Sequence, residues 1–275
     1  MKNLKNQIQK NQSKFKISTF LLLFSFVCSM FINSSMQASN KTNSSLSANP
    51  TAELDKAKKD GKAVFLVITD NAAANLDKAN VLANGASSKV AKSIVISLNK
   101  DDKANSSLVT KLGIANVPVP FILVISSKGM SIAGFQYNQV TTETLVKAVP
   151  SAKHEAVLFA LSEKKPVFIV VSKKGLSDKT TILANCKSAS AKVISKPVVI
   201  EFDVNDSKDS EFLKQVGVTS LKDKSITIVV NTSGQIADKF EGIVLETALT
   251  TSANKVVKSS GCAPGACGGK KECGK

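Results

Sequence analysis

The sequence predicts an α/β protein built from two tandem domains, each with a mixed central sheet flanked by helices. Three observations lead to this prediction. A strongly apolar strand at 62–68 returns at 165–171 with similar residues. The order of the segments after each strand also repeats, and helix-like and strand-like patterns alternate within each copy. A repeat this long indicates duplicated globular domains rather than the short units of a solenoid.

Matching residues also follow each copy of the strand. The spacing between matched positions drifts from 101 to 105 residues, which small loop insertions explain. On this alignment Gly85 occupies the position of Cys186. The matches are Val81-Leu82-Ala83-Asn84 with Ile182-Leu183-Ala184-Asn185, Leu112-Gly113-Ile114 with Val216-Gly217-Val218, Lys128-Gly129 with Ser233-Gly234, and Phe135 with Phe240.

We expect the first domain to cover residues 51–150. Its first helix ends at Asp60-Gly61, and its hairpin turns through Ser126-Ser127-Lys128-Gly129,. The predicted elements are a helix at 51–59, a strand at 62–68, a helix at 75–82, a strand at 93–98, a helix at 106–112, a hairpin of 121–125 and 132–135, and a helix at 142–149.

The second domain is expected at 151–258 and repeats this order. Runs of Val, Ile and Phe at 64–68 and 167–171 are typical of central strands buried on both faces,. The predicted elements are a helix at 155–161, strands at 165–171 and 198–203, helices at 178–186 and 210–216, a hairpin of 226–230 and 236–240, and a helix at 246–257. The predicted core contains Val64, Leu66, Ile94, Ile96, Ile122 and Val124 in the first domain, and Val167, Ile169, Val199, Ile226 and Ile228 in the second.

The first 38 residues have the pattern of an export signal. They contain lysines but no Asp or Glu, and the apolar run from Phe20 to Ile32 is shorter than the ~20 residues of a membrane span,. Cleavage is expected after Ala38, and a retained membrane anchor is the alternative. Lipidation at Cys28 is less favoured, because Ser25 and Val27 depart from the lipoprotein signal. Residues 39–50 then form a flexible leader, and the protein is periplasmic or extracellular.

The chain is strongly basic, with a formal net charge of +16 carried by lysine alone, since arginine is absent. Arginine is the residue that binds phosphate and guanine through two parallel hydrogen bonds. There is also no Trp and a single Tyr, so stacking surfaces for single strands are missing,. Nucleic-acid binding is therefore not expected. The expected partners are other exported proteins or the envelope surface, and a membrane only if the signal is retained.

The order of elements resembles the thioredoxin fold. Ala57-Lys58-Lys59-Asp60-Gly61-Lys62-Ala63-Val64-Phe65-Leu66 is similar to the entry of exported thioredoxin-like proteins. Leu112-Gly113-Ile114-Ala115-Asn116-Val117-Pro118 is similar to the approach to their cis-proline. The resemblance covers about 51–150 and 151–258, and implies a Cys-x-x-Cys pair where the first strand meets its helix.

Neither copy has a cysteine at that junction, which contains residues 69–75 in the first copy and 172–178 in the second. Two candidates remain for the cis-proline of the first copy, Pro118 and Pro120. The second copy has Ser220-Leu221-Lys222-Asp223-Lys224-Ser225 there, without a proline. A protein-binding or spacer role fits these losses better than dithiol chemistry within the domains.

Four cysteines follow the signal, and three of them lie in the tail at 259–275. Cys186 shares a helix face with Ile182 and Leu183, so it is either a core residue or a partner for a tail thiol. Cys262 and Cys267 are the candidate redox pair. Together with Cys273 they are also candidate ligands of Cu(I) or another soft metal, because three thiolates fall one short of a closed zinc site. A structural disulfide, or attachment to another chain, is the third interpretation.

Other chemistry has little support in the sequence. His154 is the only histidine and stands beside Lys153 and Glu155, so we expect a solvated surface role. Asp101-Asp102, and Asp203 with Asp206, are expected to cap helices. The predicted function is an exported scaffold that binds proteins and carries a cysteine-rich tail; the alternative is a thiol-disulfide oxidoreductase or Cu(I)-binding protein that works through the tail.

Overall fold

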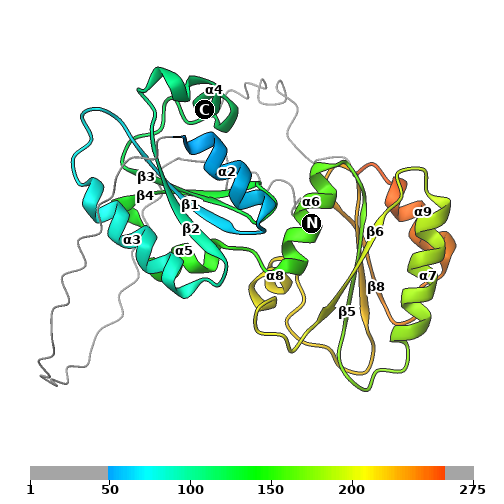
Figure 1. Cartoon of the computed structure of the whole chain (residues 1–275). Coiled ribbons are helices and arrows are strands. Elements are labelled where there is room, and N and C mark those ends of the chain that lie inside the picture. Colours follow the sequence, from blue (N-terminus) through cyan, green and yellow to red (C-terminus); the bar gives the residue numbers. More distant parts are fainter. Residues whose placement is uncertain (1–48, 258–275) are drawn as a thin grey trace, which may run out of the picture. The chain divides into compact units, whose positions relative to one another are not determined.

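The computed structural model describes residues 49–257, which divide into two compact units, 49–150 and 151–257 (Figure 1). The predicted export signal, most of the leader, and the tail with Cys262, Cys267 and Cys273 lie outside the described residues, as does Cys28. Each unit has its own sheet and its own covering helices.

The first unit alternates helices and strands before it ends in a hairpin and a helix. Its first helix begins where the Asn49 side chain accepts a hydrogen bond from the Ala52 amide, with Pro50 in the first turn,. The elements are α2 (Pro50–Lys59), β1 (Ala63–Thr69), α3 (Leu76–Lys89), β2 (Ser93–Asn99), η1 (Lys103–Asn105), α4 (Ser106–Leu112), β3 (Phe121–Ile125), β4 (Ser131–Gln136), η2 (Tyr137–Gln139) and α5 (Thr142–Ala148).

The second unit repeats this order without the two short 3-10 helices. Its first helix is capped by Ser151, whose hydroxyl accepts a hydrogen bond from the His154 amide,. The elements are α6 (Ala152–Ser162), β5 (Val167–Ser172), α7 (Lys179–Lys192), β6 (Val198–Asp203), α8 (Ser210–Gln215), β7 (Ile226–Val230), β8 (Ile236–Glu241) and α9 (Glu246–Asn254).

Both sheets are mixed and have the same topology. The strand order is β2-β1-β3-β4 in the first unit and β6-β5-β7-β8 in the second. The first pair is parallel in each sheet, and the other two pairs are antiparallel. Each unit therefore has the mixed central sheet flanked by helices that the sequence predicts.

Helices cover both faces of each sheet (Figure 1). In the first unit Leu66 packs toward α2 and α4, while Phe65 packs toward α3 and α5. In the second unit Ile169 packs toward α6 and α8, and Phe168 toward α7 and α9. All seven residues of β1 and all six of β5 are buried, which confirms the prediction of central strands covered on two faces,.

Two of the predicted core residues are only partly buried, Ile94 and Val199. They lie on β2 and β6, which are edge strands, so these side chains have neighbours on one side only. The other nine predicted core residues are buried.

The helices after the first strands are longer than the sequence indicated. They continue to Lys89 and Lys192 rather than ending at Leu82 and Cys186. Gly85 lies inside α3, where a Cβ atom would stand 3.3 Å from Thr142 Oγ1, so a small residue suits the close approach of α5. The last helix ends at Asn254 instead of Val257.

The structure also corrects the alignment of the two copies. α3 and α7 both have 14 residues, and their buried positions match at a constant spacing of 103, Ala79 with Ile182 and Ala86 with Ala189. The counterpart of Cys186 is therefore Ala83, which is also buried, and not Gly85. The sequence alignment was wrong here because Val81-Leu82-Ala83-Asn84 and Ile182-Leu183-Ala184-Asn185 are similar at a spacing two residues shorter than that of the buried positions.

Candidate functional site

The sheet topology brings three loops together at one end of the strands in each unit. This end of the sheet is called the edge below. β1 and β2 are parallel and β3 runs against them, so Ile68 near the end of β1 pairs with Phe121 at the start of β3. The loop after β1 therefore meets the end of β2 and the loop before β3. The equivalent pair in the second unit is Val171 with Ile226. The resemblance to thioredoxin-like proteins implies that a dithiol would lie here.

In the first unit the loop after β1 is tied to the end of β2 by side chains. The Asn71 amide donates to Asp101 Oδ2 at 3.1 Å, and Asn99 Nδ2 donates to Asn71 Oδ1 at 2.8 Å. Within the loop, the Ala72 amide donates to Asp70 Oδ1. The polar groups of this loop thus bond one another.

Lys100 joins the third loop to the same edge. Its Nζ donates to the carbonyl oxygens of Val117 at 3.0 Å and Ala115 at 3.3 Å, both in the segment before β3. That segment contains the cis peptide bond, which lies between Val119 and Pro120. Of the two candidates, Pro120 and not Pro118 follows a cis bond, and it immediately precedes β3.

In the second unit Ser225 takes the position of Pro120, because each residue immediately precedes the third strand. Ser225 is fully buried, and both its amide and its hydroxyl donate to Asp178, at 2.9 and 2.7 Å. The Ser225 hydroxyl also lies 3.2 Å from that of Ser172, the last residue of β5. A serine hydroxyl and a carboxylate therefore occupy the position that corresponds to Pro120, next to the end of β5.

A lysine ties this edge as well. Lys173 Nζ donates to the Leu221 carbonyl oxygen at 3.0 Å, so the loop after β5 is held to the loop before β7. Lys100 follows β2 and Lys173 follows β5, but each holds the loop before the third strand of its unit. Ser225 and Ser172 are buried, so neither hydroxyl is accessible to a substrate. The arrangement favours a structural role for these hydroxyls over a role as nucleophile.

Cys186 is the one cysteine among residues 49–257, and it lies in the core between the sheet and α9. Burial raises the pKa of its thiol to about 12, because the apolar surroundings disfavour the thiolate,. A thiol held neutral and covered in this way is a core residue, as the first interpretation of the sequence held.

His154 is not the solvated residue that the sequence suggested. Its ring stacks on Phe212 with centroids 4.4 Å apart, and Phe212 in turn contacts Phe202. Desolvation by burial lowers the pKa of His154 to about 4,. Sequence reasoning missed this because the ring partner lies on α8, far along the chain from α6.

Four aspartates after the second strands were expected to cap helices, and of these only Asp102 does so. Asp102 caps η1 by accepting from the Ala104 amide, as expected, but Asp101 instead holds Asn71 of another loop. Asp203 and Asp206 accept from amides two residues ahead, in turns that precede α8. The buried carboxylate of this region is that of Asp209, which accepts from the Ser151 hydroxyl.

Two further features were sought among the described residues. Between 49 and 257, no helix combines the length and apolar character needed to cross a membrane. In the same range, His, Cys, Asp and Glu side chains nowhere gather in threes around a possible metal position. The candidate metal ligands Cys262, Cys267 and Cys273 lie outside this range, so they stay a prediction.

No protein-family model matches the chain, and no curated protein matches it. Several solved structures are similar. The first two thioredoxin domains of Eps1p from Naumovozyma dairenensis share 12% identity over 74% of this chain and 95% of that chain, with a TM-score of 0.29. The zinc-bound form of human ERp44 shares 12% identity over 74% of this chain and 57% of that chain, with a TM-score of 0.32.

A further similar structure is the NTD_N/C domain of the alkylhydroperoxide reductase AhpF from Enterococcus faecalis. It shares 12% identity over 74% of this chain and 99% of that chain, with a TM-score of 0.24. Likeness at this level assigns no activity to the chain. The strand order and connectivity described above are those of two tandem thioredoxin-like domains.

Proposed function

We propose that this chain is an exported protein-interaction scaffold whose two thioredoxin-like domains lack a redox dithiol and which carries a cysteine-rich tail. One observation carries the proposal. The edges where the family holds its dithiol are closed by internal hydrogen bonds, through Asp101 in the first unit and Asp178 in the second. Export is supported by the lysine-rich and apolar pattern of residues 1–38.

Exposed apolar residues of the second unit support a role in binding proteins. Ile243 and Leu245, between β8 and α9, expose 60% and 69% of their surface, while Val244 between them is buried. The alternation places both exposed side chains on the outer side of this loop. Large exposed apolar groups that neighbour one another are typical of interaction surfaces.

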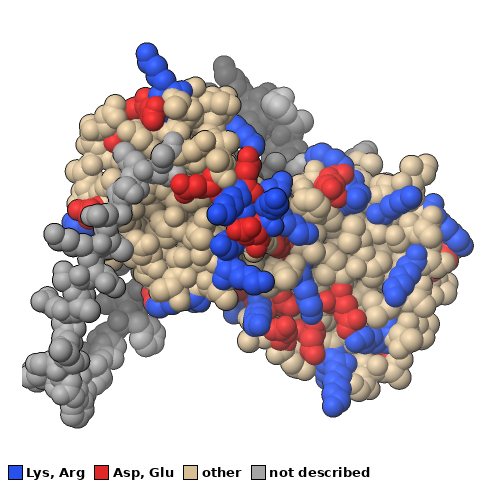
Figure 2. Space-filling model, viewed as in Figure 1, with Lys and Arg blue, Asp and Glu red and all other residues tan. Residues whose placement is uncertain are grey.

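The visible surface of the two units carries charges of both signs (Figure 2). Figure 2 shows lysines interspersed with acidic residues on the visible face of both units, without a face of one sign. Exported proteins, rather than a polyanion, are the partners that fit an apolar site on such a surface.

A photo-crosslinking residue at position 243 is expected to capture a partner in the producing cell. The same group at exposed Lys208 is the control, and equal capture at both positions would contradict a site on this loop.

The alternative function uses the tail cysteines. An insulin-reduction assay on protein without residues 1–38 separates the two, because turnover through the tail requires Cys262 or Cys267. We expect equal, background rates for this protein and for its Cys262→Ser variant, with Cys186→Ser as the matched control. Turnover that disappears in Cys262→Ser alone would make the protein a thiol-disulfide oxidoreductase.

The metal form of the alternative has its own test. The protein is reduced without oxygen, titrated with Cu(I) and examined by native mass spectrometry. A metal adduct lost on replacing Cys262, Cys267 and Cys273 by serine would give the tail a metal-binding function, since a soft metal requires deprotonated thiols. No cysteine-dependent adduct leaves the tail as a structural or attachment segment of the scaffold.

A further inference from the structure

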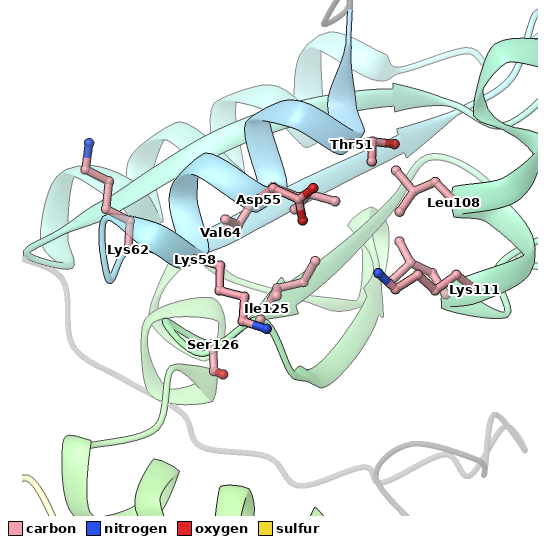
Figure 3. A pocket seen from close by; sticks show the side chains of 12 residues that line it. Thr51, Asp55, Lys58, Lys62, Val64, Leu108, Lys111, Ile125 and Ser126 are labelled. Atoms are coloured by element: carbon pink, nitrogen blue, oxygen red, sulfur yellow. The ribbon is translucent and has the colours of Figure 1, made fainter.

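A pocket in the first unit lies at the edge of the sheet opposite the closed loops. It is formed by α2, α4, the start of β1 and the end of β3 (Figure 3). Its apolar wall contains Val64, Leu108 and Ile125, and its polar lining contains Asp55, Lys58 and Lys111. The role proposed above makes no use of this pocket.

Two lysines face the opening from different helices. In Figure 3 the ammonium groups of Lys58 on α2 and Lys111 on α4 point toward the space between the helices, whereas Lys62 points away. Lys62 is paired with Asp60 at 3.6 Å. The remaining charges are two lysines and the carboxylate of Asp55, so the pocket carries one net positive charge. A single negative charge would neutralise it.

In the second unit the residues that correspond to the pocket lining are different. At a spacing of 103 residues, set by the buried pair Ala57 and Ala160, His154 stands for Thr51, Leu158 for Asp55 and Leu161 for Lys58. At the spacing of 104 that relates α4 to α8, Phe212 stands for Leu108 and Gln215 for Lys111.

These replacements fill the space and remove the charges. His154 and Phe212 stack at 4.4 Å, and Leu161 packs against the same core. The second copy thus has an aromatic pair in this space and lacks the lysines that correspond to Lys58 and Lys111. The first copy keeps smaller side chains and puts two cations at the mouth of the space.

We propose that this pocket binds a small aliphatic monocarboxylate, with its apolar group against Val64, Leu108 and Ile125 and its carboxylate between Lys58 and Lys111. An apolar wall with cations at its mouth suits an amphiphilic anion. A doubly charged phosphate ester would be left unneutralised by the single net charge, and lysine offers no bidentate fork to phosphate. The lysines make charge-assisted hydrogen bonds, the stronger kind.

The test is an NMR titration of the full chain with 4-methylpentanoate, following the backbone amides of Leu108 and Ile125. Lys58→Gln and Lys111→Gln are each expected to weaken binding about tenfold, the usual loss for one charge-assisted hydrogen bond. Lys59→Gln removes the same charge from exposed α2 surface without touching the pocket, and is expected to leave binding unchanged. Amides around His154 and Phe212 should not shift.

Three results would overturn the proposal. Equal binding of 4-methylpentanamide would show that the carboxylate is not recognised. Equal weakening by Lys59→Gln and Lys111→Gln would reduce the effect to general charge attraction. Tighter binding of a dipeptide that ends in leucine and has a blocked amino end would mean that the site recognises a polypeptide C-terminus instead of a free acid.

Leu108→Phe, which copies the second unit, is expected to abolish binding. An unchanged far-UV spectrum verifies that this variant folds.

Discussion

At the residue scale, Asp178 links the loop after β5 to the residue that precedes β7. It accepts two hydrogen bonds from a residue that has no exposed surface, Ser225. Removing this acceptor leaves two donors of a buried residue without their partner, which costs stability. The identity of this pair was not predictable from the sequence, since the two residues are distant in the chain and neither belongs to a family motif.

We expect Asp178→Ala to lower the free energy of unfolding of the second unit by about 1–3 kcal/mol. The measurement is urea denaturation followed by far-UV circular dichroism. Asp203→Ala is the matched control, because its carboxylate is exposed and accepts one local amide, so it should cost under about 1 kcal/mol,. Equal losses in the two variants would mean that the Ser225 contacts contribute nothing.

His154 gives the second unit a dependence on pH. Its folded pKa is about 4, whereas an unfolded histidine titrates near 6.5,. Between these values the unfolded chain binds more protons, so stability is complete above pH 6.5 and falls as the pH drops toward 4. The effect is at most about 3 kcal/mol, and less for a ring that is only partly buried.

The measurement is the urea midpoint of the second unit at pH 7 and at pH 4.5, in the wild type and in His154→Gln. The wild type is expected to lose more stability between the two pH values than the variant does. Carboxylates titrate in both proteins, so the difference isolates the histidine. A variant with the same or a steeper loss would mean that the ring is solvated after all.

At the element scale, the strands were predictable and the helix ends were not. Runs such as Phe121–Ile125 and Val198–Asp203 were assigned with their observed bounds, because an apolar strand ends sharply where turn residues begin,. α3 and α7 run on through Ala, Ser and Gly, which carry little periodic signal. Their length is set by packing against α5 and α9, and each pair is bridged by an ion pair, Lys89 with Glu143 and Lys192 with Glu246.

The edge strand β4 depends on a glycine. A Cβ at Gly134 would lie 2.4 Å from Cζ of Phe121, whose ring covers the glycine from the neighbouring strand. Gly134→Ala is expected to destabilise the first unit by about 1–3 kcal/mol through overpacking. Phe121→Leu replaces the ring with a shorter side chain, so the double variant should lose less than the sum of the single losses. Additive losses in a double-mutant cycle of urea unfolding would show that the ring does not cause the cost.

At the scale of the whole molecule, each unit has a separate core. The four buried clusters divide cleanly, two in the first unit and two in the second, and none contains residues of both. Domain order was predictable because the duplication repeats strands and turns together. The pocket of the first unit was not, since it depends on side-chain size at Thr51 and Leu108, which sequence patterns treat as ordinary surface and core positions.

The separate cores predict separate unfolding. Tyr137 is the single tyrosine and the chain has no tryptophan, so tyrosine fluorescence reports on the first unit alone. Leu66→Ala, at a fully buried site, is expected to shift this fluorescence transition by about 2–5 kcal/mol,. Ile169→Ala removes similar volume from the second core and should leave the fluorescence midpoint in place while it lowers the circular dichroism midpoint. A fluorescence shift in both would mean that the units unfold together.

The changing offset between the copies records how they diverged after the duplication. It is 103 through the first strands and the helices that follow, 104 from β2 to α4, 105 in the hairpins, and 104 again in the last helices, where buried Leu145 matches Leu249. One residue is added between α7 and β6 and one between α8 and β7, and the second unit has one residue fewer between β8 and α9 than the first has between β4 and α5. The main helices and strands keep their order in both copies, whereas the connecting loops and the lining of one cavity differ. The cavity lies open in the first copy and is filled by side chains in the second, so one domain architecture supplies two different modules.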